Sequence, residues 1–265
     1  MLKVDKVPAP RALAFRVGDY LWGGLAGLGV SFVLLGAWQA ASLSLGDFLL
    51  PAPVAVWERV CELFSNLKQS ELEITFWRAC IGVSVSLILG IICGLVAGYF
   101  RTAMAILRPL MTILLSMPPI VWIVMALFWF GFGNASVLFT IIVIVFPLTF
   151  ASAAMGMASV EPSGIELFDA YRLGLAKKIR YLYVPHLTEY IISSIGVAVA
   201  SGVRIVVMAE LLGASDGVGA RIADARTMLD TTTVLAYVAI TIAFVAAWDY
   251  LITKPLEITL MPWRR

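Results

Sequence analysis

Residues 109–160 contain no Asp, Glu, Lys, Arg or His. A helix needs about 20 apolar residues to cross the hydrocarbon core of a bilayer, so this run is long enough to cross twice. Its one turn-like cluster, Gly-Phe-Gly-Asn-Ala-Ser at residues 131–136, lies near the middle. Of the 265 residues, 61% are hydrophobic and 14% charged, more apolar surface than a soluble domain of this length can bury. We therefore predict an all-α integral membrane protein.

Six membrane-spanning helices can be drawn along the chain. Their expected ranges are 20–45, 74–99, 103–130, 135–157, 187–212 and 232–253. These runs are continuously apolar rather than alternating, which disfavours a membrane β-barrel. Pro118 and Pro119 interrupt the third run and Pro147 interrupts the fourth. The plain interpretation is a packing kink, and the alternative is a break that lines a pathway.

The distribution of Lys and Arg predicts the orientation in the membrane. With the N-terminus inside, thirteen of these residues fall in inner segments, and the outer segments hold four: Arg59, Lys68, Arg221 and Arg226. Cytoplasmic loops carry the excess of positive charge, so both termini are expected in the cytoplasm. Residues 1–19 then form a cytoplasmic N-terminal segment, and residues 20–265 form one transmembrane domain. No cleavable signal peptide is expected, because the first apolar stretch is too long for one.

Two stretches outside the expected spans also have a helical pattern. In residues 53–69 the apolar side chains recur at helical spacing, which predicts an amphipathic helix that lies along the outer membrane face or caps the bundle. Residues 161–185 form the longest polar stretch on the predicted cytoplasmic side, long enough for one or two short helices. Within it, Ile165, Phe168 and Tyr171 recur at helical spacing.

Several kinds of chemistry need residues that the chain lacks. The sequence has no G-x-x-x-x-G-K-[ST] motif, so it is not expected to bind or hydrolyse ATP itself. The single histidine, His186, offers neither a His/Cys metal site nor a nucleophile–base pair. The three cysteines, Cys61, Cys80 and Cys93, are expected to stay unbridged. No basic stripe with interleaved aromatics indicates nucleic-acid binding. We predict a non-catalytic protein without a cofactor or metal of its own.

The charged residues of most interest within the expected spans are Arg78, Arg204 and Glu210. A charge at the bilayer centre costs about 2.5–3.5 kcal/mol on insertion scales, so each needs a reason. Arg204 and Glu210 share the fifth span but face different sides of the helix, so no direct pair between them is expected. Arg204 either lines a solute path or serves as a structural hydrogen-bond hub. Arg204 and Glu210 are each expected to face a partner helix or an aqueous cavity, although Glu210 is close enough to the outer end to reach water instead. Arg78 is expected to snorkel.

Three stretches together resemble the permease subunits of bacterial ABC importers, in the taurine, sulfonate and nitrate branch of the type I permeases. They read LLPAPVAVWERVCELF, MPPIVWIVMALFWFGFGNAS and VMAELLGASDGVGARIADAR, in the order found in the family. The resemblance covers roughly residues 49–250 and implies a fold of six transmembrane helices with both termini inside. The residues expected to line the solute path are Met117, Pro118, Trp122, Arg204 and Glu210.

The family also carries a cytoplasmic loop with the pattern E-A-A, three residues, then G. Residues 168–174 read Phe-Asp-Ala-Tyr-Arg-Leu-Gly, with Phe168 in place of the Glu and Gly174 at the right offset. Pro185 comes two residues earlier than in the family pattern. The resemblance implies that residues 161–185 dock on a cytoplasmic ATPase, while the alternative is a helix lying on the membrane surface. The expected docking residues are Ile165, Phe168, Asp169, Ala170, Tyr171, Arg172 and Gly174.

The resemblance implies a larger assembly in the bacterial inner membrane. It comprises two permease copies, two ATPase subunits that hold ATP and Mg²⁺, and a periplasmic or lipoprotein solute-binding protein, surrounded by lipid. A small anion such as taurine, a sulfonate or nitrate is the expected solute, although related permeases serve pyrimidine precursors. An ion-coupled secondary transporter would need internal repeats and acidic residues at mid-membrane, and a membrane enzyme would need clustered polar groups. The sequence shows neither pattern.

Overall fold

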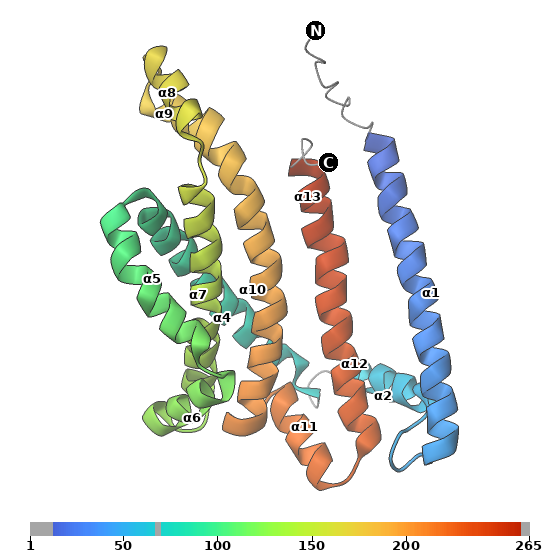
Figure 1. Cartoon of the computed structure of the whole chain (residues 1–265). Helices are drawn as coiled ribbons and strands as arrows, with labels where there is room; N and C mark the ends of the chain where they lie inside the picture. Colours follow the sequence, from blue (N-terminus) through green and yellow to red (C-terminus); the bar gives the residue numbers. More distant parts are fainter. Residues whose placement is uncertain (1–12, 67–69, 261–265) are drawn as a thin grey trace.

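The computed structural model describes residues 13–66 and 70–260, with side chains described from residue 29 onward apart from 257, 258 and 260. Within those ranges all regular elements are helices (Figure 1). In chain order they are α1 (Leu13–Leu45), α2 (Pro53–Ser65), α4 (Leu72–Tyr99), α5 (Arg101–Ser116), α6 (Pro119–Phe130), α7 (Asn134–Ala158), α8 (Pro162–Ala170), α9 (Leu175–Lys178), η1 (Ile179–Tyr183), α10 (Val184–Gly213), α11 (Val218–Thr227), α12 (Thr231–Trp248), η2 (Asp249–Thr253) and α13 (Lys254–Leu260).

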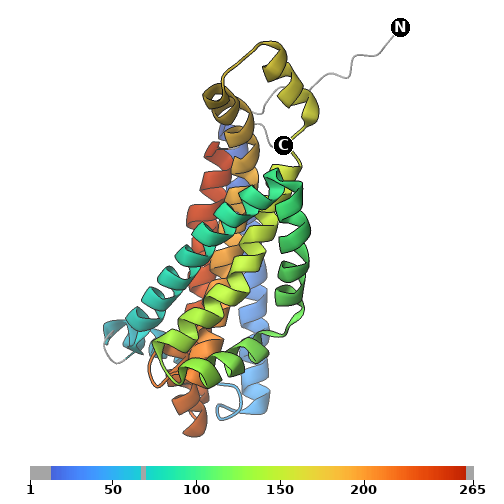
Figure 2. The ribbon, with the colours of Figure 1, turned by 90° about the vertical axis from the view of Figure 1, so that its left-hand side faces the viewer.

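The long helices run alongside one another between two ends of the molecule, and successive ones point in opposite directions (Figures 1 and 2). The short helices gather at these ends. Helices α8 and α9 protrude at one end, which we call the α8 end, and α2, α6 and α11 lie at the other, which we call the α11 end. Helix α1 begins and α13 ends toward the α8 end. This alternation brings the two expected outer segments, around α2 and α11, to the same end.

Four described helices are long and apolar enough to cross a membrane: Leu72–Tyr99, Asn134–Ala158, Leu175–Gly213 and Thr231–Leu256. Helices α5 and α6 together form a fifth candidate, bent by 95° at its break. In α1, the part with described side chains contributes the apolar stretch Gly29–Leu45. The protein is therefore a multi-pass membrane protein, while the count of six spans and the orientation stay predictions.

The third expected span, 103–130, is broken between α5 and α6. Met117 and Pro118 are extended, because a residue before proline disfavours the helical conformation and proline has no N–H to donate. With 12 residues, α6 is about 18 Å long, too short to cross the bilayer. The predicted interruption is confirmed, and it is a sharp turn rather than a kink. At Pro147, in contrast, α7 continues as one helix.

The helix that ends at Gly213 begins at Leu175, well before the expected start of the fifth span. Pro185 lies inside it, where its ring crowds the carbonyl one turn earlier and its missing N–H breaks the α-helical pattern. Ile179–Tyr183, just before this proline, forms a wider π-helical turn. The same arrangement recurs before Pro255, where Asp249–Thr253 forms a π-helical turn. The wide turns let both helices continue through a proline.

Helices α4 and α7 pack at very short range along a row of glycines. Gly90, Gly94 and Gly98 are spaced four apart on α4, so they share one face. A Cβ atom added at Gly94 would lie 2.6 Å from the carbonyl oxygen of Phe150, and one at Gly98 would lie 2.6 Å from Cβ of Met157. Small residues at this spacing allow membrane helices to approach closely. The G-x-x-x-G spacing is visible in the sequence, but this packing role was not predicted from it.

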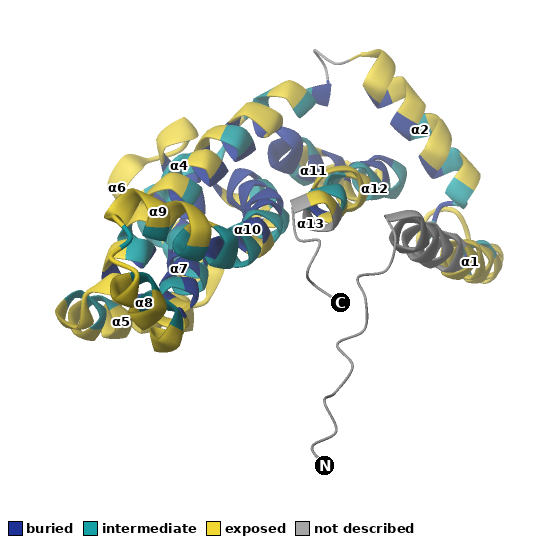
Figure 3. Ribbon diagram, turned by 90° about the horizontal axis from the view of Figure 1, so that it is seen from above, coloured by how far each residue is buried: buried dark blue, intermediate teal, exposed yellow. Residues whose placement is uncertain are grey.

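Two of the three apolar clusters among the described residues contain most of the buried core. The larger one joins α4, α6, α7 and α10, with Val83, Ile141 and Val206 among its buried side chains. A separate one joins α2, α11 and α12 around Leu63 and Tyr237. Figure 3 shows buried residues concentrated on α10 and its neighbours, while α8 is largely exposed. Helix α2 occupies most of the segment expected to be amphipathic, and 67–69 lie outside the described residues.

Replacing Gly94 by Leu should destabilise the protein, because the new side chain would overlap the backbone of α7. Overpacking a tight core typically costs about 1–3 kcal/mol. Gly36→Leu is the matched control, because a Cβ at Gly36 in α1 meets nothing within 4 Å. Thermal unfolding in detergent checks this: we expect a clearly lower midpoint for the Gly94 variant, and equal midpoints would contradict the close approach.

Candidate functional site

A buried ion pair at the α11 end joins α4 to α10. Nη1 of Arg78 donates to Oε1 of Glu210 at 2.9 Å, and the two side chains are 5% and 0% exposed. The same guanidinium reaches the following loop, where its Nη2 pairs with Oδ1 of Asp216 at 2.7 Å. Its Nε donates to Oδ1 of Asn134, the first residue of α7, at 2.7 Å. One arginine therefore connects three helices and a loop.

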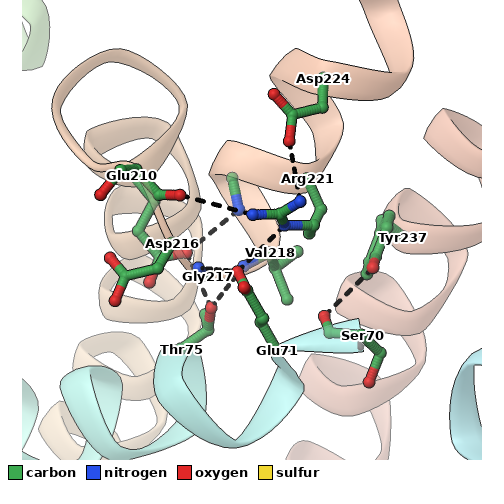
Figure 4. A network of polar contacts seen from close by, with 12 residues as sticks. Ser70, Glu71, Thr75, Glu210, Asp216, Gly217, Val218, Arg221, Asp224 and Tyr237 are labelled. Atoms are coloured by element: carbon green, nitrogen blue, oxygen red, sulfur yellow. Dashed lines mark hydrogen bonds and ion pairs between the residues drawn. The ribbon is translucent and has the colours of Figure 1, made fainter. Parts of the chain in front are cut away.

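The remaining oxygen of Glu210 is also satisfied (Figure 4). Its Oε2 accepts from Oγ1 of Thr75 at 2.7 Å and from the backbone N–H of Gly219 at 3.1 Å. The backbone N–H of Val218 in turn donates to Oγ1 of Thr75 at 2.8 Å. These N–H groups belong to the first turn of α11, where the helix dipole favours negative charge. The carboxylate is thus neutralised by an arginine on one side and a helix N-terminus on the other.

Two glycines allow the chain to fold back over this carboxylate. Gly217 has φ of 99°, a conformation that glycine adopts without steric cost. A Cβ at Gly217 would lie 2.4 Å from Oε1 of Glu210, and one at Gly219 would lie 2.3 Å from the carbonyl oxygen of Val207. The loop that follows α10 therefore needs glycine at these positions, because it packs directly on the ion pair.

Two expectations for this region were wrong. Arg78 does not snorkel toward water, because Glu210 and Asp216 satisfy its charge inside the protein. Glu210 does not reach water, because its side chain is fully buried, and the other expectation, that it faces a partner helix, agrees with its pair with Arg78 of α4. The expected lack of a direct pair between Arg204 and Glu210 agrees with the described contacts, in which Glu210 pairs with Arg78.

Arg204 lies on the one exposed stripe of α10, a helix that is otherwise largely buried. The neighbours of Arg204 on this stripe are Val197, 49% exposed, and Met208, 41% exposed. Among the described contacts of Arg204, the side-chain hydrogen bond runs from its Nε to the carbonyl of Ala200 in the same helix, at 3.0 Å. A hub role would require bonds to other helices, so the described contacts favour the path role, which stays a prediction.

The other expected path residues cluster at the break between α5 and α6. Met117 and Pro118 are exposed there. Trp122 is half-buried on α6, and its Nε1 is buried without a hydrogen-bond partner among the described residues. No described hydrogen bond links this group to Arg204 or Glu210. The structure therefore places the expected path residues in separate groups.

The segment expected to couple to an ATPase protrudes from the bundle at the α8 end (Figure 1). No residue of α8, α9 or η1 is fully buried. Its exposed apolar side chains include Tyr171 at 72%, Leu175 at 71% and Leu167 at 55%. Contiguous exposed apolar groups of this kind mark interaction surfaces.

The expected docking residues divide into two sets in the structure. Ile165 and Phe168 are half-buried, and Asp169 forms an ion pair with Lys178 across the turn. The backbone N–H of Leu173 also donates to the carbonyl of Phe168 at 3.0 Å, which closes the turn. The exposed set is Ala170, Tyr171, Arg172 and Gly174. The first set shapes the segment, and the second is available to a partner.

His186 lies at the base of this segment, half-buried. Its Nε2 is 3.0 Å from Oγ of Ser159, which also donates to the hydroxyl of Tyr190 at 3.0 Å. These contacts tie the end of α7 to the start of α10. In the described part of the chain, no group of three or more His, Cys, Asp or Glu side chains is arranged to hold a metal ion.

This arrangement of long apolar helices with short helices at both ends defines an all-helical, multi-pass membrane protein. Residues 86–253 match the family described as the binding-protein-dependent transport system inner membrane component. The match covers more than half of the chain, and the protein belongs to this family. It is therefore a permease subunit of an ABC importer, and it is not itself an enzyme.

Several relatives of this chain are permease proteins named for the solute that they transport. The chain is 27% identical over 246 residues to the taurine transport system permease protein TauC of Escherichia coli (strain K12), which covers 89% of this chain and 88% of TauC. It is 27% identical over 273 residues to the putative aliphatic sulfonates transport permease protein SsuC of Bacillus subtilis (strain 168), covering 100% and 98%. The formylaminopyrimidine transport permease protein ThiX of Halalkalibacterium halodurans is also 27% identical, over 237 residues, covering 88% and 93%.

Breaking the buried ion pair should destabilise the protein strongly. Arg78→Leu leaves the carboxylate of Glu210 buried without its arginine, which typically costs about 3–5 kcal/mol, and Glu210→Leu should cost less, because Arg78 keeps Asp216 as a partner. The double variant leaves neither charge uncompensated, so its loss should be smaller than the sum of the two single losses. Thermal unfolding of the four proteins in detergent gives the coupling free energy. Additive losses would show that the two charges do not depend on each other.

Proposed function

We propose that this chain is the membrane-spanning permease of an ATP-driven importer for a small anionic solute, delivered by a binding protein on the outer side. The protruding α8–α9 segment carries the proposal. A permease without ATP-binding residues must receive its driving force from a partner, and this segment offers the exposed surface for that contact. Tyr171 and Arg172 supply the aromatic and arginine side chains that dominate protein interfaces.

The structure suggests how motion at the docking segment reaches the solute path. The helix Leu175–Gly213 continues from the segment through the molecule as one unit of 39 residues, about 58 Å long. The pair between Asp169 and Lys178 ties α8 to the beginning of that helix. A displacement of α8 by an ATPase would therefore move a helix that carries Arg204 about three quarters of the way along its length and Glu210 near its far end.

The exposed stripe of α10 is expected to pack against a second protein surface. A charged side chain within the bilayer normally faces a water-filled cavity or another chain rather than lipid. We propose that a second copy of this chain covers the stripe and that the solute passes between the copies. Two ATPase subunits, which hold ATP and Mg²⁺, would dock at the α8 end on the cytoplasmic side of a bacterial inner membrane.

The anionic character of the solute is supported by two observations. Two of the relatives are named for taurine and aliphatic sulfonates, whose sulfonate groups carry negative charge. The exposed cation of Arg204 would suit such a group. An ion-coupled mechanism is less well supported, because Glu210 is already held by Arg78, Thr75 and Gly219.

Replacing Tyr171 by Ala should weaken docking of the ATPase, because truncating an interface anchor often costs 2 kcal/mol or more, a factor of about 30 in affinity. Phe32→Ala is the matched control, an equally exposed aromatic in α1, away from the docking segment. The measurement is ATP hydrolysis stimulated by the binding protein in proteoliposomes. We expect a marked loss for the Tyr171 variant alone. Unchanged stimulation of ATP hydrolysis would refute the docking assignment. Solute uptake that does not depend on ATP would refute the proposed function.

Replacing Arg204 by Gln should raise KM for uptake of an anionic solute by about tenfold or more, because a charge-assisted contact is lost. Arg204→Lys keeps the charge and should lose less. Met208→Leu, on the same stripe of α10, is the control for packing. Uptake of labelled taurine and of an alkanesulfonate into proteoliposomes measures the effect. Equal KM values for all four proteins would exclude Arg204 from solute recognition.

A further inference from the structure

A polar pocket of about 350 Å³ lies at the α11 end, bordered by α2, α11 and the beginning of α12. It is separate from the exposed stripe of α10 and from the docking segment at the α8 end. Its charged lining residues are Arg59, Glu62, Arg221, Asp224 and Asp230. Such a concave site with several convergent charges is suited to receiving a charged group.

The two arginines in the pocket already have carboxylate partners. Arg59 pairs with Glu62 at 2.7 Å, and its Nε donates to Oγ1 of Thr233 at 2.9 Å. Arg221 pairs with Asp224 at 3.0 Å. The carboxylates are the more accessible partners: Glu62 is 62% exposed against 40% for Arg59, and Asp224 is 56% exposed against 35% for Arg221. The surface available to an incoming group is therefore the acidic one.

The third carboxylate, Asp230, stays ionised in the pocket. It caps α12, where its Oδ1 accepts from the N–H of Thr233 at 3.0 Å and its Oδ2 from the hydroxyl of the same residue at 2.6 Å. Burial works to raise the pKa of Asp230, but these bonds and the nearby Arg59 outweigh it and hold the pKa below its usual range. Each carboxylate oxygen of Asp230 has two lone-pair sites, so it can accept a second hydrogen bond while it caps α12.

The whole α11 end has an excess of negative charge. Within the described ranges 46–66, 70–73 and 214–230, which make up this end, the basic residues are Arg59, Arg221 and Arg226. The acidic residues in the same ranges are Asp47, Glu58, Glu62, Glu71, Glu73, Asp216, Asp224 and Asp230. Interfaces pair surfaces of opposite potential, so the partner of this face is expected to be basic.

The pocket is also directly connected to the buried ion pair. Arg221, in the pocket wall, donates from Nε to Oε2 of Glu71 at 3.1 Å. The same carboxylate oxygen accepts from the N–H of Gly217 at 2.6 Å, at the start of the turn that covers Glu210 (Figure 4). A group that binds Asp224 and loosens Arg221 would thus act on the turn that links α11 to α4 and α10.

We propose that this pocket is the socket for a Lys or Arg side chain of the solute-binding protein. The inference rests on the proposed function and on the prediction that the α11 end faces outward. The basic side chain forms charge-assisted hydrogen bonds with Glu62, Asp224 and Asp230. Docking there competes with Arg59 and Arg221 for their carboxylates, which gives the binding protein a route to the ion pair between α4 and α10.

The test compares charge reversals on one helix. Glu62 and Glu58 are both exposed and lie one turn apart on α2, but only Glu62 lines the pocket. The complete transporter is placed in lipid nanodiscs, and the probe is the purified binding protein with which the wild-type transporter restores solute uptake. We expect Glu62→Lys and Asp224→Lys each to weaken the Kd at least about tenfold. Glu58→Lys should change it less than about threefold.

A charge swap tests whether binding can be restored, and a transporter variant that is merely misfolded would not regain binding. A Lys or Arg of the binding protein that crosslinks to the pocket is replaced by Glu, and this partner should bind the Glu62→Lys transporter more tightly than the wild-type partner does. Equal weakening by Glu58→Lys and Glu62→Lys, a Kd unchanged by either pocket variant, or the absence of rescue would each overturn the socket. Wild-type transporter without ATP-dependent uptake would instead overturn the proposed function.

Discussion

The buried ion pair between Arg78 and Glu210 is the interaction on which the α11 end depends. Removing either charge from water costs several kcal/mol, so Glu210 is stable inside only because Arg78 is present, and Arg78 is stabilised by Glu210 and Asp216 together. The remaining hydrogen-bonding capacity of the pair is used by Thr75, Asp216 and the first turn of α11. Helices α4 and α10, the glycine-rich loop and α11 are thereby fixed to one another at a single point.

The role of α10 follows from its two ends. At one end it continues into the exposed segment that is proposed to meet an ATPase, and at the other it carries Glu210. Arg204 lies between, on the stripe that the single chain leaves exposed. One helix thus connects the proposed site of force, the proposed solute path and the network beneath the pocket at the α11 end. In the proposed function the permease contributes two arrangements of these parts, and the partner ATPase supplies the chemistry.

Much of the fold could be predicted from the sequence, because apolar runs and prolines act locally. The run at residues 109–160 indicated membrane helices, and Pro118 with Pro119 indicated the break between α5 and α6. The pair Arg78–Glu210 could not be predicted, because the two residues are 132 positions apart and meet only through the tertiary fold. The continuous helix that ends at Gly213 starts at Leu175, and this early start was missed because a wide turn before Pro185 lets the helix continue. The glycine row on α4 was visible, but its meaning required the position of α7.

The central claim is that the α8–α9 segment faces the cytoplasm, where an ATPase can reach it, while α11 faces outward. The direct test starts from a variant without Cys61, Cys80 and Cys93 and adds a single cysteine as Ser163→Cys in α8 or Ser215→Cys beside α11. Both sites are exposed, so a membrane-impermeant maleimide can reach either one. In intact spheroplasts the account predicts labelling at 215 and, at 163, labelling only after permeabilisation. Labelling at 163 in intact spheroplasts would contradict it.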